Sequence, residues 1–210
     1  IAGFQNQISQ YNSQLNGFLT SLNAERDALA QNLAEKLSLN PRFDGMRNDG
    51  VSLAWDYEAA DIRMGGAGSE NWTPAEQQEI LQNRPDVINK GRDVVGGLEG
   101  AEGHHQQNVA HHPEQQADSD NIKFYRSKKE HLDEGHKGNW RNESNEPMTD
   151  KNQMLEDTNQ RRVDVKEGEI AQSEKRIFRN EFRGLGIAVA IGLGVGATIG
   201  FIVTLAQTGV

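Results

Sequence analysis

The stretch EGHHQQNVAHHPEQQADSDNIKFYRSKKEHLDEGH, residues 102–136, holds all six histidines of this 210-residue chain. Within it, Ile122 and Phe124 alternate with polar residues, which is typical of a strand with one buried face. The glycine-rich residues 94–103 are expected to form a flexible or tightly turned strand that leads into the first histidines. The histidines are therefore attached to ordered elements and do not form a simple polar tract.

A helix is expected just after the strand that contains Ile122 and Phe124. Ser127 and Glu130 have the spacing of a helix N-cap and its capping box, so this helix would carry His131. The surrounding residues 123–141 contain six basic and three acidic residues, although the chain as a whole has a net charge of -9. The local positive charge lies beside the histidines, where an anionic substrate would be held.

Adjacent histidines on a strand suit two different chemical roles. The side chains of His104 and His105 would point to opposite faces, so one can bind a metal while its neighbour acts as a base. Imidazole, with a pKa of about 6.5, can deprotonate water at neutral pH, and a divalent ion would neutralise charge on a phosphate. His131 is the candidate for a second metal ligand. Nearby basic residues that could hold phosphates are Lys123, Lys128 and Lys129.

Less specific interpretations of the histidines also exist. His111 and His112, which precede Pro113, are typical of an exposed loop. The whole cluster could also be a histidine-rich metal tract. The predicted turn, strand and helix start between the two groups of histidines argue against that interpretation.

Taken together, residues 55–142 resemble the GHH-signature group of HNH/endonuclease VII-type nuclease toxins, which occur as C-terminal domains of bacterial polymorphic toxins. The similarity is carried by GHH at 103–105, NV at 108–109, PE at 113–114, DNIKF at 120–124, EHL at 130–132, His136 and GNWRN at 138–142. The upstream segment ADIRMGGAGSENWTPAEQQEILQ is similar to the segment that precedes the signature in such toxins.

The resemblance implies an α+β fold with a ββα-metal, or His-Me finger, nuclease core. In this core a hairpin with a helix across it encloses one ion. By position, His104 matches a metal ligand and His105 matches the general base. Asn121 matches the asparagine that fixes the loop and orients the base, and His131 matches the second metal ligand.

Two further residues match less central positions. His136 aligns with an additional histidine that contacts the leaving phosphate or only packs, and Asn108 matches a structural position. The implied cofactor is one divalent metal ion, which could be Mg, Mn, Ni or Zn because imidazole ligands admit several metals. The chain has no cysteine, so a thiolate site is excluded.

The segments around this core are mostly helical by pattern. Apolar residues at helical spacing predict a helix over 4–38 that packs on or pairs with another helix. Residues 51–63 are compatible with a strand or a short helix. Thr73 as N-cap, with Pro74 and Glu76 behind it, predicts a helix that ends near Arg84. Residues 142–172 are expected to be a linker or a solvated helix, followed by a basic amphipathic segment over 173–183.

The last part of the chain is uncharged and apolar. Residues 184–206 are long enough to span a bilayer as a helix, and small residues recur in them every four positions. Basic residues precede this stretch, which predicts that the chain before it lies in a cytoplasm. The alternative is a glycine-rich helix buried in a soluble core.

These patterns divide the chain into four predicted segments. They are a helical or coiled-coil segment over 1–40, a nuclease domain over 41–142, a polar linker with a basic segment over 143–183, and a membrane helix over 184–206.

The favoured function is a metal-dependent endonuclease toxin that hydrolyses phosphodiester bonds of DNA. It would be a secreted or delivered effector that acts in the target-cell cytoplasm, in association with a membrane through residues 184–206. Expected partners are DNA, a cognate immunity protein, a delivery system or upstream toxin partner, and a second helix in a helix–helix oligomer. The alternative is a membrane-inserting, pore-forming or anchoring protein whose histidines only bind metal or sense pH.

Overall fold

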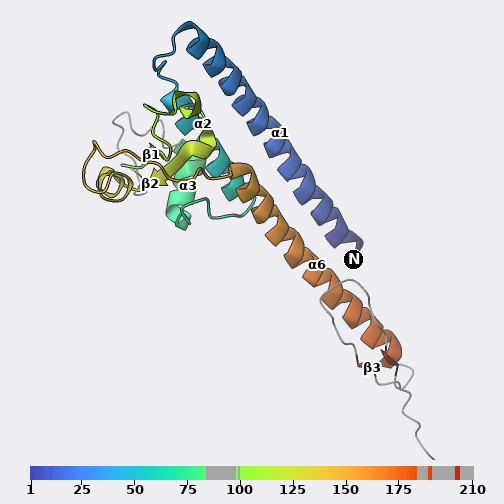
Figure 1. Ribbon diagram of the computed structural model, residues 1–210. Helices are drawn as coiled ribbons and strands as arrows, with labels where there is room; N and C mark the ends of the chain where they lie inside the picture. Colours follow the sequence, from blue (N-terminus) through green and yellow to red (C-terminus); the bar gives the residue numbers. More distant parts are fainter. Residues whose placement is uncertain (84–97, 99, 184–188, 191–201, 204–210) are drawn as a thin grey trace, which may run out of the picture. The chain divides into compact units, whose positions relative to one another are not determined.

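The computed structural model describes residues 1–83, 98, 100–183, 189–190 and 202–203 (Figure 1). The chain forms two compact units, one of residues 12–160 and one of residues 1–11 with 161–210. The elements, in chain order, are the helices α1 (Ala2–Leu39), α2 (Arg47–Arg63) and α3 (Pro74–Asn83), strand β1 (Glu102–His105), the 3-10 turns η1 (Pro113–Gln115) and η2 (Ser119–Asn121), strand β2 (Ile122–Tyr125), the short helix α5 (Lys128–Glu130), the π-helical turn η3 (His131–Gly135), helix α6 (Lys151–Arg183), and strands β3 (Val189–Ala190) and β4 (Ile202–Val203).

Helix α2 lies at the centre of the first unit and is buried on two faces. Trp55 and Ala59 join the core that α2 forms with α3 and the hairpin, where the Trp55 and Phe124 rings stack with centroids 3.6 Å apart. Leu53 and Tyr57 join a second core, formed with α1 and the beginning of α6. A helix that is apolar on two faces has no single stripe, which is why residues 51–63 were also compatible with a strand.

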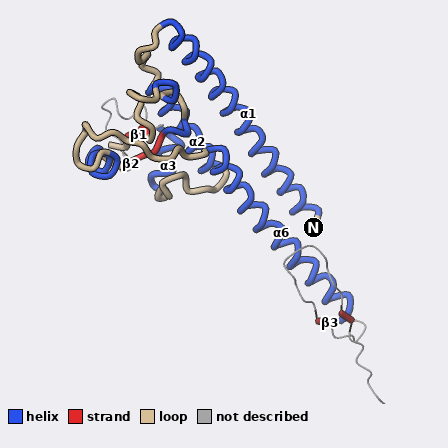
Figure 2. The backbone as a smooth tube through the Cα atoms, viewed as in Figure 1, coloured by secondary structure: helices blue, strands red, loops and turns tan. Residues whose placement is uncertain are grey.

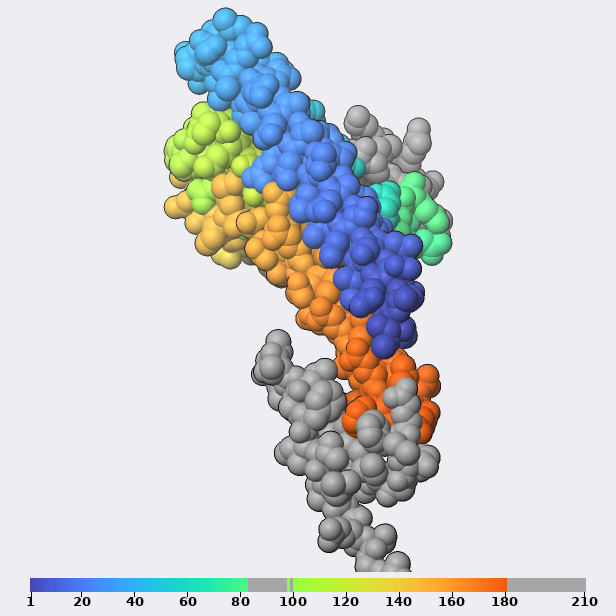
Figure 3. Space-filling model, turned by 90° about the vertical axis from the view of Figure 1, so that its right-hand side faces the viewer, coloured from blue at the N-terminus to red at the C-terminus, as the bar shows by residue number. Residues whose placement is uncertain are grey.

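Helix α1 confirms the helix predicted over 4–38, and within the first unit it supplies part of the core. Leu22 and Leu33 are buried, and Leu22 packs with Leu155 of α6. Figure 3 shows the middle of α1, in blue, lying along the first turns of α6, in orange. Burying each of these leucine side chains is worth about 1.5–3 kcal/mol, so α1 is part of the folding unit.

The capping box predicted for α3 is confirmed. The Thr73 N–H donates to the Glu76 carboxylate at 2.7 Å, and the Glu76 N–H donates to the Thr73 hydroxyl at 3.4 Å. Helix α3 ends at Asn83, next to the predicted end at Arg84. The loop before α3 is held by Glu58, whose carboxylate accepts from the Trp72 indole N–H at 2.7 Å.

Strands β1 and β2 form the predicted antiparallel hairpin, with His104 opposite Lys123 and His105 opposite Ile122. Figure 2 shows both strands as short segments surrounded by loop. Gly103 lies against α2, because a Cβ atom at this position would be 2.9 Å from both methyl groups of Val51. The glycine of the GHH triplet therefore lets the hairpin pack directly on α2.

The helix predicted to carry His131 is present but short. The Ser127 hydroxyl accepts from the Glu130 N–H at 3.1 Å, as predicted for the N-cap. The Glu130 carboxylate accepts from the N–H of Arg126, one residue before the position that the predicted capping box requires. After three α-helical residues the chain widens into the π-helical turn that begins at His131. Single π turns are rare and are frequent at functional sites.

Of the residues predicted to be a linker or a solvated helix, 142–172, those from 151 onward belong to helix α6 and 142–150 are not helical. Leu155 and Thr158 of α6 are buried in the first unit, so its first turns are not a solvated linker. In the second unit, the Arg162 guanidinium lies 3.9 Å from the centroid of the Tyr11 ring.

The membrane helix predicted over 184–206 lies almost entirely outside the described residues. The four described residues in this stretch are not helical, since Val189 pairs with Val203 and Ala190 with Ile202 in an antiparallel ladder. The prediction of helix is wrong for these four residues. Among the helices that the structure describes, none has both the length and the apolar character needed to cross a bilayer.

Candidate active site

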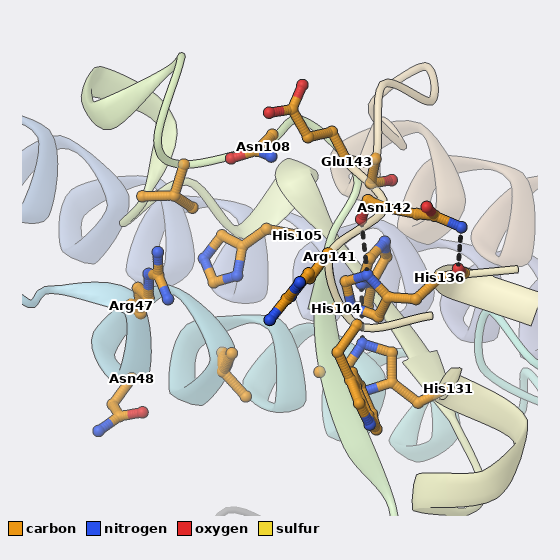
Figure 4. A pocket seen from close by; sticks show the side chains of 15 residues that line it. Arg47, Asn48, His104, His105, Asn108, His131, His136, Arg141, Asn142 and Glu143 are labelled. Carbon is orange, nitrogen blue, oxygen red and sulfur yellow. Dashed lines mark hydrogen bonds between the residues drawn. The ribbon is translucent and has the colours of Figure 1, made fainter. Parts of the chain in front are cut away.

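Three histidines meet beside the hairpin, one from β1 and two from the segment that follows β2. His104, His131 and His136 have ring nitrogens that all lie within 4.8 Å of one another (Figure 4). The closest pair is His104 Nδ1 and His131 Nε2, at 2.8 Å. The structure thus places the two predicted metal ligands together and adds His136 as a third member.

The outer nitrogens of two of these rings are held by acceptors. His131 Nδ1 lies 2.7 Å from the Glu102 carboxylate, and His136 Nδ1 lies 2.9 Å from the carbonyl oxygen of Asn142. Because an acceptor holds the proton on Nδ1, the Nε2 atom of each ring carries the lone pair, and that of His131 faces His104 Nδ1 at 2.8 Å. This arrangement, in which a carboxylate or carbonyl orients a histidine, is the usual outer support of a metal ligand.

The environment of His104 favours the neutral imidazole that a metal requires. Burial, together with the neighbouring His131 and His136, lowers the pKa of His104 to about 3. Its Nε2 atom is buried and has no hydrogen-bond partner among the described residues. Three imidazole rings with nitrogen atoms this close together are a donor set that fits a divalent transition metal.

His105 points away from the three-histidine cluster, as the alternation of side chains along a strand requires (Figure 4). Its ring still lines the cavity that the cluster lines. Its Nε2 atom donates to the carbonyl oxygen of Gln116 at 2.9 Å, which leaves Nδ1 as the basic nitrogen. Burial lowers the pKa of His105, the Gln116 carbonyl opposes this effect, and the nearby Arg47 adds to it. A lowered pKa keeps the ring neutral at neutral pH, so it can accept a proton.

Asn121 is fully buried and ties the two ends of the loop between β1 and β2 together. Its side-chain oxygen accepts from the Gln107 N–H at 2.6 Å. Its amide nitrogen donates to the carbonyl oxygens of Gln107 and Gln115, both at 3.2 Å. Gln115 directly precedes Gln116, the residue that holds His105, so Asn121 supports His105 through the backbone.

The cations at the site differ from those predicted. None of the three predicted lysines lines the cavity around the histidines in the described structure: Lys123, Lys128 and Lys129. Lys129 is 86% exposed and pairs with Asp133. The cavity, of about 410 Å³, is lined instead by Arg47 from the beginning of α2 and by Arg141 from the loop after η3.

The remaining histidines and Asn108 occupy the loop between the strands. His111 and His112 are exposed on this loop, near Glu143 and Glu114 respectively, which agrees with their interpretation as loop residues. Asn108 lines the cavity, and its side-chain oxygen accepts from the Ala110 N–H at 2.8 Å to shape a turn.

No site role was predicted from the sequence for Glu102, Arg47, Arg141 and Trp140, although the last two belong to the GNWRN segment of the resemblance. A signal for Glu102 was present, because it stands two residues before His104 and strand side chains at this spacing share a face. Arg47 gave no local signal, since it is far from the histidines in the chain and reaches them only through the packing of α2 on the hairpin.

A short antiparallel hairpin and a helical turn that bring histidines together define a candidate metal centre in an α+β domain, and this arrangement fits a nuclease. Residues 42–126 match the family described as GHH signature containing HNH/Endo VII superfamily nuclease toxin. The predicted resemblance is confirmed over these residues, which include His104 and His105 of the GHH signature. His131 and His136 lie beyond the matched residues, and it is the structure that joins them to His104. Searches of curated proteins and of solved structures gave no match.

Proposed function

We propose that this protein is a metal-dependent endonuclease that hydrolyses phosphodiester bonds of DNA. The observation that carries the proposal is the meeting, in one cavity, of a three-histidine cluster and a fourth histidine whose basic nitrogen is free. His104, His131 and His136 would hold one divalent cation. When bound, the cation would neutralise charge on the scissile phosphate and on the leaving oxygen.

The chain's own residues supply the remaining chemistry. His105 Nδ1 accepts a proton from a water molecule, whose oxygen attacks phosphorus while the bond from phosphorus to the leaving oxygen breaks. The Gln116 carbonyl holds the ring so that Nδ1 stays available and stabilises the protonated ring that forms. Arg47 and Arg141 supply positive charge at the cavity wall, where phosphate oxygens would lie.

The toxin family supports a biological setting for this activity. The enzyme would be a delivered effector that cuts DNA in the target-cell cytoplasm, and a cognate immunity protein would protect cells that make it. The apolar stretch over 184–206 has no part in this proposal.

The test is cleavage of plasmid DNA by the full chain after removal of metal with EDTA. We expect no cleavage by the metal-free protein and nicking after addition of Mn²⁺ or Mg²⁺. His105→Ala should abolish nicking, whereas the matched control His112→Ala, an exposed loop histidine, should retain it. Equal loss in both variants, or cleavage that EDTA does not affect, would refute the proposal. A parallel assay with RNA decides which nucleic acid is cut.

A further inference from the structure

Two exposed aromatic side chains lie at the cavity that holds the histidines and at the cleft beside it. Among the described residues, the large hydrophobic side chains that remain substantially exposed include only two aromatics, Trp140 (45%) and Phe43 (42%). Trp140 lines the cavity and lies 5.0 Å from His136 between ring centroids. Phe43 lines a second cleft of about 560 Å³. One exposed aromatic thus lies in the candidate active site, and the other lies in the cleft that shares Arg47 with it.

The two hollows adjoin one another. Both are lined by Arg47 and by Val109, so the wall between them is shared. The two adjoining hollows are together called the groove: Trp140 and the histidines line one, Phe43 lines the other, and Arg47 lines both. Its two aromatic side chains come from different parts of the chain, the loop after η3 and the loop before α2.

Positive charge accompanies each aromatic ring. The Arg47 guanidinium lies 4.0 Å from the centroid of the Phe43 ring, and the Lys128 ammonium lies 6.0 Å from the centroid of the Trp140 ring. Arg47 forms no ion pair with any described residue, and burial lowers its pKa without opposition from a carboxylate. The one acidic residue that lines the groove is Glu143, which lies 3.5 Å from His111.

Alternating cations and exposed aromatic rings are how proteins hold unpaired nucleic acid strands, with phosphates on the cations and bases stacked on the rings. In a duplex, each base face is already covered by its neighbours, so such rings gain little from paired DNA. We propose that this groove binds a single-stranded stretch of DNA, with bases stacked on Trp140 and Phe43 on either side of the scissile phosphate. The inference rests on the proposed function, because it names the substrate form for the same site.

The test is binding of fluorescein-labelled single-stranded DNA and of the corresponding duplex to the full chain in EDTA, followed by fluorescence anisotropy. We expect tighter binding of the single strand. Trp140→Ala and Phe43→Ala should each weaken single-strand binding by about five- to a hundredfold and change duplex binding less. Trp140→Phe should restore most of the affinity, and the control Val165→Ala, which removes an exposed side chain elsewhere, should have no effect.

The outcomes separate this inference from the proposed function. Equal affinity for both DNA forms, or no effect of either alanine variant, overturns the groove even if plasmid cleavage is normal. Loss of single-strand binding in both variants supports the groove even if the protein fails to cleave. Because Trp140 touches two histidines of the cluster, Phe43→Ala, which touches none of them, is the decisive variant.

Discussion

Removal of the Glu102 carboxylate should weaken metal binding without destroying the site. Glu102 accepts from His131 Nδ1 at 2.7 Å, and its side chain is 31% exposed. Without it, the His131 ring can rotate and its proton can move to Nε2, the nitrogen that faces the cluster. Loss of such a support typically costs ten- to a hundredfold in metal affinity, and the partial exposure of this pair points to the lower part of that range. We therefore expect Glu102→Ala to raise the Kd for Mn²⁺ or Zn²⁺ by about tenfold, which is about 1.4 kcal/mol.

A second variant separates the contribution of the Glu102 charge from that of its hydrogen bond to His131. Glu102→Gln keeps an oxygen acceptor for His131 Nδ1 but loses the charge, and charge-assisted hydrogen bonds are about twice as strong as neutral ones. It should therefore lose about half of the binding free energy that the alanine variant loses. Glu114→Ala is the matched control, because Glu114 makes a similar pair with His112, at 3.3 Å, outside the cluster.

The assay is competition for the metal with a chromophoric chelator, together with plasmid nicking as a function of metal concentration. Excess metal should restore nicking by Glu102→Ala to nearly the wild-type rate, because His105 is unchanged. Metal affinity equal to that of the wild type would refute the assigned role of Glu102. A nicking rate of Glu102→Ala that stays low in excess metal would also refute this role.

Three other predictions test the supports of the site. In Gly50→Ala, the new Cβ would lie 2.9 Å from the Ala117 carbonyl carbon and 3.0 Å from the Gln116 carbonyl oxygen. Because the displaced Gln116 carbonyl would misplace His105, nicking should slow by about ten- to a hundredfold, and an unchanged rate would contradict this prediction. Asn121→Ala removes hydrogen bonds made by a fully buried amide and should lower the free energy of unfolding by about 1–3 kcal/mol in urea titrations, and an unchanged midpoint would contradict this. Zn²⁺ at a hundred times its Kd should stabilise the fold by about 2.7 kcal/mol and raise Tm. His104→Ala should remove this rise in Tm, and a rise that persists in the variant would show that the metal binds outside the three-histidine cluster.

Local patterns predicted the parts of the site that depend on neighbours in the chain. The Ser127 cap and the opposite directions of His104 and His105 follow from capping and strand alternation, the hairpin was implied by the resemblance, and all are present. The predicted lysines also lie near the histidines in the sequence, but none of them lines the cavity, and Lys128 only approaches the ring of Trp140. The direction of a side chain at a cavity depends on the packing of the elements around it, and alternation alone does not supply that.

What could not be predicted depends on contacts between distant segments. Arg47 reaches the cavity because α2 packs on β1, and that packing requires Gly103 to meet Val51 closely. The position of His136 depends on a π turn, a feature that residue preferences do not reveal. The three-histidine cluster is therefore a product of tertiary structure, although each of its members was visible in the sequence.

The ion pairs that Arg26 of α1 forms with the loop between the strands have a consequence for the order of folding. Arg26 pairs with Asp118 and Asp120, and Asn23, also of α1, accepts a hydrogen bond from Asn152 of α6, 129 positions away. Contacts of such long range cost chain entropy before they are rewarded, so they form late. The loop that holds His105 is thus secured only when both flanking helices have been synthesised and docked. A nascent or truncated chain can carry every histidine of the cluster and still lack a working nuclease.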